Sequence, residues 1–185
     1  MTRVLAVVLL LAIPLSAHTL LPTGFREVVS AATFIARGRV TDVRAARFPD
    51  RGIETIATVG VDHVIKGVAS NFVSVHIPGG SLGGVRVVTV GAPRLQTGDS
   101  AVFFLKRGED NGWIPVGLSM GIYRVHLDSR TRLPFVNPPV LEGATASVGR
   151  VVRGDVRRKS LPVSEFESMV RLVMAGDRGG ARGQQ

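Results

Sequence analysis

Cysteine is absent from this sequence of 185 residues. Disulfide bonds, thiol nucleophiles and cysteine-ligated zinc are therefore excluded. Stability must come from packing, and apolar residues make up 45% of the chain against 20% charged residues. This balance, over a length suited to one domain, is typical of a globular chain with a real core.

Aromatic residues are also scarce, with one Trp and one Tyr in the whole chain. A core can use every aromatic residue of the central stretch, which leaves none to stack on single-stranded nucleic acid, so we predict no nucleic-acid partner. Ser81, Ser100 and Ser119 lie in turn-like surroundings, and the carboxylates are spread over separate predicted strands and turns. We therefore predict a protein that is not an enzyme and needs no cofactor.

Only the N-terminus carries a long apolar run. Arg3 precedes the apolar stretch Val4 to Leu15, and Leu15-Ser16-Ala17 ends in small residues, which is the layout of a secretory signal peptide over 1–17. A membrane anchor is the alternative, but Pro14 breaks the run, which is shorter than the about 20 residues of a spanning helix. We predict a secreted or periplasmic protein that begins at His18 and contacts membrane only through its leader.

Short apolar runs between glycine-rich and proline-rich turns dominate the middle of the chain. They predict long strands at Thr33 to Arg47 and Ile53 to Ile65, with a bulge or bend at Gly38. Further strands are predicted at Phe72 to Ile77, Val85 to Val90, Ala101 to Lys106, Ile122 to Leu127 and Leu133 to Val136. Closure removes exposed edges, so we expect a mostly β domain over 18–136, a small closed or partly open antiparallel barrel that is OB-like.

Helices are expected at both ends of this barrel. Gly24 to Ala32 fits a short helix capped near Thr23, and Ser164 to Glu167 matches a capping box that opens a helix over 161–176. The second helix is expected to dock on the barrel and to end at Gly176. Residues 137–160 read as a flexible basic connection, and 177–185 as a disordered tail.

Two segments are candidates for binding. The first is the glycine-rich loop at Pro78, Gly79, Gly80 and Ser81. We interpret it as a hairpin loop and not as a phosphate-binding loop, because a phosphate-binding loop would open a helix and this one opens a strand. The second candidate is a basic segment near the C-terminus, in a chain that has 20 Arg and 3 Lys. It consists of Arg150, Arg153, Arg157, Arg158 and Lys159. Such a segment favours anionic polymers, although a scattered, solvated arginine surface explains most of the charge equally well.

The histidines show no metal-binding spacing. His63, His76 and His126 lie on different predicted strands, so each is read as a surface or core histidine. His18 differs, because cleavage after Ala17 would leave its amine and imidazole free to chelate copper or zinc. The alternative is that cleavage merely happens to leave histidine first.

A run of motifs along the chain resembles a set of exported bacterial proteins with a netrin-type or tissue-inhibitor-of-metalloproteinase module. The matching segments are Ala36 to Val40, Val61 to Gly67, Ile77 to Gly80, Gly91 to Pro93, Gly98-Asp99, Phe103 to Leu105 and Gly117 to Val125. The resemblance implies an OB-like barrel and a non-enzymatic binding module that acts on secreted zinc proteases. The animal inhibitors place an N-terminal cysteine on the catalytic zinc, and this chain has no cysteine to place there.

We therefore expect an exported binding module for another secreted or envelope protein, with a metalloprotease as one such partner. Two alternatives stay open, an electrostatic binder of anionic surface polymers and a copper or zinc protein built on His18.

Overall fold

A computed structural model describes residues 24–68, 70–109, 112–139 and 160–182. The predicted leader, His18, Thr23 and the basic residues from Arg150 to Lys159 lie outside the described residues, as does most of the predicted connection 137–160. Predictions on those segments stay predictions.

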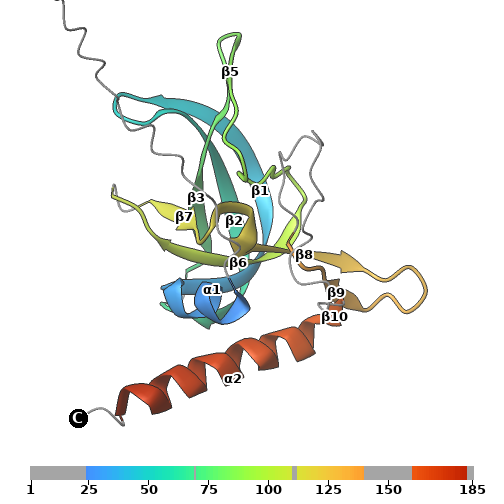
Figure 1. Ribbon diagram of the computed structural model, residues 1–185. Coiled ribbons are helices and arrows are strands. Elements are labelled where there is room, and N and C mark those ends of the chain that lie inside the picture. Colours follow the sequence, from blue (N-terminus) through green and yellow to red (C-terminus); the bar gives the residue numbers. More distant parts are fainter. Residues whose placement is uncertain (1–23, 69, 110–111, 140–159, 183–185) are drawn as a thin grey trace, which may run out of the picture.

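Five strands pair around a partly open ring, which confirms the predicted OB-like barrel. They are β1 (Phe34–Phe48), β2 (Gly52–Lys66), β3 (Phe72–Pro78), β6 (Ser100–Arg107) and β7 (Trp113–Pro115). The order is β1-β2-β3-β7-β6, and β6 pairs again with β1 (Figure 1). The contact of β3 with β7 is parallel and is made through the single pair Val75 and Trp113, so the described barrel is partly open there. This parallel pair departs from the all-antiparallel expectation.

Strand β1 can pair with both β2 and β6 because it is long and irregular. Its register with β2 shifts at three places, one of them between Arg37 and Gly38, where a bulge or bend was predicted. A Cβ at Gly38 would lie 2.4 Å from the backbone oxygen of Gly60. Glycine is thus required for the close approach of the two strands, and the bulges bend β1 around the barrel.

Strand β6 separates two apolar cores. Phe103 and Leu105 point into the barrel, whereas Val102 and Phe104 face outward into a second cluster beneath the helices. A strand buried on both faces needs a continuous apolar run, which explains the sequence from Ala101 to Leu105. The second core includes four packed rings, those of Phe25, Phe104, Tyr123 and Phe166.

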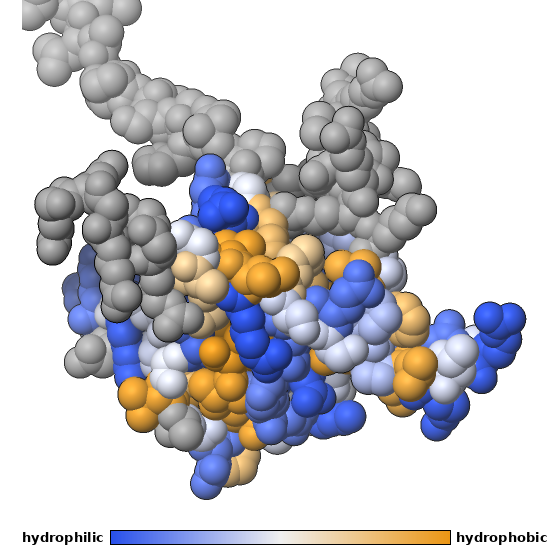
Figure 2. All heavy atoms as spheres, turned by 90° about the horizontal axis from the view of Figure 1, so that it is seen from below, coloured by the Kyte–Doolittle hydropathy of each residue, from blue (hydrophilic) through white to orange (hydrophobic). Residues whose placement is uncertain are grey.

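The sheet continues beyond the ring toward the C-terminus. The first half of β6 pairs with β8 (Ile122–Leu127), which follows a short 3-10 helix η1 (Leu118–Gly121). Next come β9 (Pro134–Val136) and β10 (Leu161–Pro162), two residues long. The β8–β9 hairpin projects at the right of Figure 1, and in Figure 2 its tip is mostly hydrophilic.

Two helices pack against each other and cover the outer core, at the bottom of Figure 1. Helix α1 (Phe25–Ala31) lies where a helix was predicted, with Gly24 as its N-cap. The backbone N–H of Gly24 donates to the Glu27 carboxylate at 2.9 Å.

Helix α2 (Val163–Arg182) corrects two predictions. It was expected to end at Gly176, and 177–185 was expected to be disordered, yet the helix continues to Arg182. Asp177 accepts hydrogen bonds from Arg26 and Ser30 of α1. These contacts join the part of α2 beyond Gly176 to α1. Ser164, the expected cap, lies inside the helix.

The predicted strand Val85 to Val90 is not part of the barrel. Only β5 (Val85–Val87) forms, and it pairs with β4 (Gly80–Leu82) in a separate two-stranded hairpin. Gly83 and Gly84 turn this hairpin with φ of +57° and +78°, as tight hairpin turns require. The hairpin projects from the end of the barrel opposite the helices (Figure 1).

Candidate binding sites

The predicted binding residues Pro78, Gly79, Gly80 and Ser81 come together at the base of the β4–β5 hairpin. Pro78 ends β3, and Gly80 and Ser81 belong to β4, so the segment predicted as a hairpin loop consists mostly of strand residues. The Gly79 N–H donates to the Ile53 carbonyl at 2.9 Å, and the Thr55 hydroxyl donates to the Gly79 carbonyl at 2.8 Å. Both bonds fasten the hairpin base to β2.

A cleft of about 300 Å³ opens between this base and the mouth of the barrel. Its floor includes Ile77 and Leu95, which belong to the core cluster inside the barrel. Its walls come from three segments, namely Pro78 to Ser81, Arg86 to Thr89 and Ala92 to Arg94, together with Val43 and Thr55. We call this space the hairpin cleft.

Four exposed valines lie on β5 and the segment that follows it, and two of them, Val87 and Val88, line the hairpin cleft. Val85, Val87, Val88 and Val90 have between 41% and 66% of their surface exposed. They lie within six consecutive residues and account for nearly half of the large apolar residues exposed in the described part of the chain. Such a concentration makes this segment a candidate interaction surface, whereas single exposed apolar residues need no explanation.

A second cleft, of about 410 Å³, is lined by charged side chains that sequence reasoning did not bring together. At its centre is the buried carboxylate of Glu54, which accepts from Arg51 Nε at 2.8 Å and lies 3.1 Å from His76 Nδ1. The Arg51 guanidinium is 4.6 Å from the centre of the Phe48 ring. Lys106, Arg107, Gly108, Glu109 and Ile114 complete the lining. We call this space the charged cleft.

The register of β2 with β3 creates this cluster. Glu54 pairs with Pro78 and Ile56 with His76, which leaves the two polar side chains diagonal to each other on one face of the sheet. Two-residue alternation predicted each strand, but it does not predict which residues of neighbouring strands meet. His76, expected to be a surface or core histidine, thus has the Glu54 carboxylate beside it.

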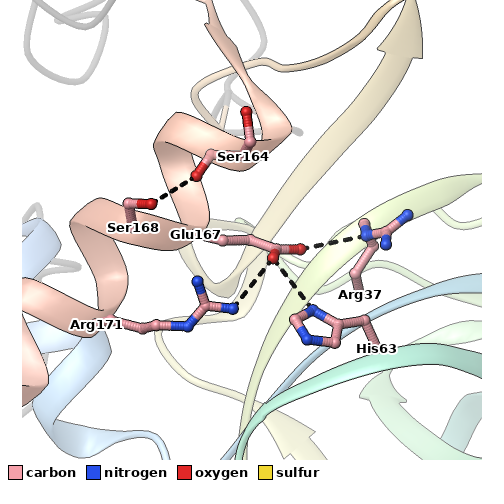
Figure 3. Close-up of polar contacts among 6 residues, drawn as sticks. All are labelled: Arg37, His63, Ser164, Glu167, Ser168 and Arg171. Atoms are coloured by element: carbon pink, nitrogen blue, oxygen red, sulfur yellow. Dashed lines mark hydrogen bonds and ion pairs between the residues drawn. The ribbon is translucent and has the colours of Figure 1, made fainter.

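A second buried carboxylate, Glu167, fastens α2 to the barrel. Its side chain is 10% exposed and lies 3.3 Å from Arg37 Nε on β1 and 3.1 Å from His63 Nδ1 on β2. Arg171, one turn along the helix, is 3.4 Å away. Figure 3 shows Glu167 pointing from the helix toward these groups. The His63 contact has the distance of an ion pair but not the geometry of a hydrogen bond, since His63 Nδ1 has no hydrogen-bond partner.

Two glycine-flanked serines fit the Gly-x-Ser-x-Gly string of hydrolases, namely Ser81 within Gly79 to Gly83 and Ser119 within Gly117 to Gly121. That motif requires a sharp turn from a strand into a helix, with the serine exposed at the turn. Ser81 lies inside β4, and Ser119 is buried in η1 with its hydroxyl unpaired. Neither serine has the setting of a nucleophile.

Comparison with known proteins adds no family to these observations. No family model and no curated protein matches this chain.

Metal-binding and membrane-spanning features can be stated for the described residues. Within 24–68, 70–109, 112–139 and 160–182, no three His, Asp or Glu residues are grouped as a metal site would need. No helix in these same ranges is long and apolar enough to span a membrane.

Proposed function

We propose that this chain is an exported, non-enzymatic binding module that recognises another secreted or envelope protein through the β4–β5 hairpin and the hairpin cleft. The observation that carries the proposal is the group of exposed valines on β5 and the segment directly after it. Burying apolar surface is the main favourable term in protein association, at about 25 cal/mol per Å².

The hairpin base supports this role because it is already ordered. Both the N–H and the carbonyl group of Gly79 form hydrogen bonds with β2. A Cβ at Gly79 would lie 2.9 Å from the Val87 carbonyl oxygen. A surface held in place before binding loses less conformational entropy in the complex. The binding residues named from sequence thus form the rigid support, and the valines supply the contact surface.

The partner is expected to offer an apolar segment that fits beside the hairpin. A secreted zinc protease is the class of partner that the family resemblance suggests. The anionic-polymer and His18 alternatives rest on residues outside the described ranges, and no observation on the described part of the chain favours them.

Affinity capture with matched variants tests the proposal. The purified chain is the bait for a secreted or envelope fraction, at low and at high salt. The double variant Val88→Ser with Val90→Ser is compared with Leu127→Ser with Leu133→Ser, which removes two similarly exposed apolar residues from the β8–β9 hairpin. We expect a discrete protein retained at both salt concentrations, lost with the valine variant and kept with the leucine variant.

Either of two results would overturn the proposal. One is equal retention of the protein by both double variants. The other is capture of only acidic polymers that high salt releases, because electrostatic binding is screened by salt.

A further inference from the structure

The two clefts share strand β2. Thr55 lines the hairpin cleft and its neighbour Glu54 lines the charged cleft, because successive side chains of a strand point to opposite faces. Pro78, which lines the hairpin cleft, is the β3 residue paired with Glu54. The two clefts therefore adjoin at the Glu54–Pro78 pair, where one partner can contact both.

We propose that the charged cleft takes an acidic side chain, Asp or Glu, of the same protein partner that docks on the hairpin. This inference rests on the proposed function and names the second chemical feature of the partner. The partner then presents an apolar segment next to a carboxylate.

The charge of the lining favours an anion. Three permanent cations line the cleft, Arg51, Lys106 and Arg107, against the carboxylates of Glu54 and Glu109. Glu54 is buried and already contacts Arg51 and His76, so its negative charge is largely balanced by residues of the cleft wall. Lys106 and Arg107 are exposed at the rim, where their field acts on an approaching ligand.

Two of the three cationic groups are also held in position before binding. Glu54 and the Phe48 ring fix the Arg51 guanidinium, and Arg107 lies 3.8 Å from the centre of the Trp113 ring. A guanidinium has five N–H donors in a planar fork, enough to serve a wall residue and a ligand carboxylate together. Held cations lose little entropy when a ligand binds.

A polypeptide fits better than an acidic glycan because of the neighbouring surface. The exposed valines of 85–90 gain from contact with apolar side chains, which a uronic-acid polymer does not carry.

An NMR titration of the isotope-labelled chain with hexaglutamate tests the inference without the partner. Hexaglutamine and trigalacturonate serve as neutral and glycan comparisons. We expect hexaglutamate to shift the backbone signals of Arg51, His76 and Lys106. Lys106→Glu should weaken this binding about tenfold, as reversing a charge in contact with the ligand does. Arg130→Glu, the same charge change on the β8–β9 hairpin, should leave it within about twofold.

Three results would overturn the inference. They are an absence of shifts in the charged cleft, equal weakening by both charge reversals, and tighter binding of trigalacturonate than of hexaglutamate.

The capture experiment separates this inference from the proposed function. If the valine variant abolishes capture while Lys106→Glu leaves it unchanged at low salt, the hairpin proposal stands and the inference fails. If hexaglutamate binds in the cleft but no protein is captured, the proposed function fails, and the assignment of the cleft to a protein partner fails with it.

Discussion

The Glu167 carboxylate of α2 lies 3.3 Å from the Nε atom of Arg37 on β1, although the two residues are 130 positions apart in the sequence. His63 and Arg171 flank the same carboxylate, so one acidic side chain joins the C-terminal helix to two barrel strands. A charge buried to this extent is stable only while its partners are in place. The described C-terminal helix is therefore part of the domain.

Replacing Glu167 with Gln should destabilise the fold. The variant keeps the shape of the side chain but leaves Arg37 and His63 facing a neutral group. Because both partners are partly exposed, we expect a loss of about 1–2 kcal/mol in the free energy of unfolding. Urea denaturation measures it, and the exposed neighbour Glu165→Gln should stay within about 0.5 kcal/mol. Equal losses in the two variants would contradict the assigned contact.

The aromatic cluster should account for most of the docking energy of α2. Phe166 is buried against Phe25, Phe104 and Tyr123, so Phe166→Ala leaves a cavity and should cost about 3–5 kcal/mol. Leu172→Ala removes an exposed side chain of the same helix and should cost less than about 0.5 kcal/mol. Thermal or urea unfolding followed by circular dichroism compares them. A Phe166 effect as small as that of Leu172 would mean that α2 does not pack on the barrel.

Gly38 should tolerate no side chain. A Cβ there would lie 2.4 Å from the Gly60 carbonyl oxygen, so Gly38→Ala must displace backbone and should cost about 1–3 kcal/mol. Gly60→Ala is the matched control, because its Cβ would approach Thr41 no closer than 3.4 Å. Both changes restrict the unfolded chain alike, so their difference in urea midpoint reports the native-state clash. A midpoint for Gly38→Ala equal to that of Gly60→Ala would refute the close approach.

Asp177 should show a pKa that depends on Ser30. The hydrogen bond from the Ser30 hydroxyl, followed by the contact with Arg26, holds the pKa of Asp177 below its ordinary value of 3.8. Ser30→Ala should raise this pKa, as NMR titration of the carboxyl carbon will measure. Asp128 is an internal control, because the backbone N–H of Thr131 lowers its pKa independently. Its titration should not change in the variant.

The same contact gives stability a defined pH dependence. The pKa of Asp177 is lower in the folded state than in the unfolded state. Its stabilising effect is therefore fully present at pH values above the ordinary pKa of 3.8, and it is lost as the pH falls through the folded-state pKa. In the variant Asp177→Asn, the free energy of unfolding should therefore decrease less steeply as the pH is lowered into the acid range. An unchanged slope of the free energy of unfolding against pH would contradict the stabilising contact between Asp177 and α1.

Local patterns in the sequence were enough to determine the β-rich barrel class, most of the strands, the bend at Gly38 and the apolar face of α2. Alternation, turn residues and helical spacing are properties of neighbouring residues, so they can be recognised without a structure. Only the tertiary structure decided that Val85 to Val90 leaves the barrel, that α2 continues past Gly176, and that Glu54 meets His76 and Glu167 meets Arg37. Those outcomes depend on strand register and on contacts between distant segments, where a shift of one residue would turn each side chain to the opposite face.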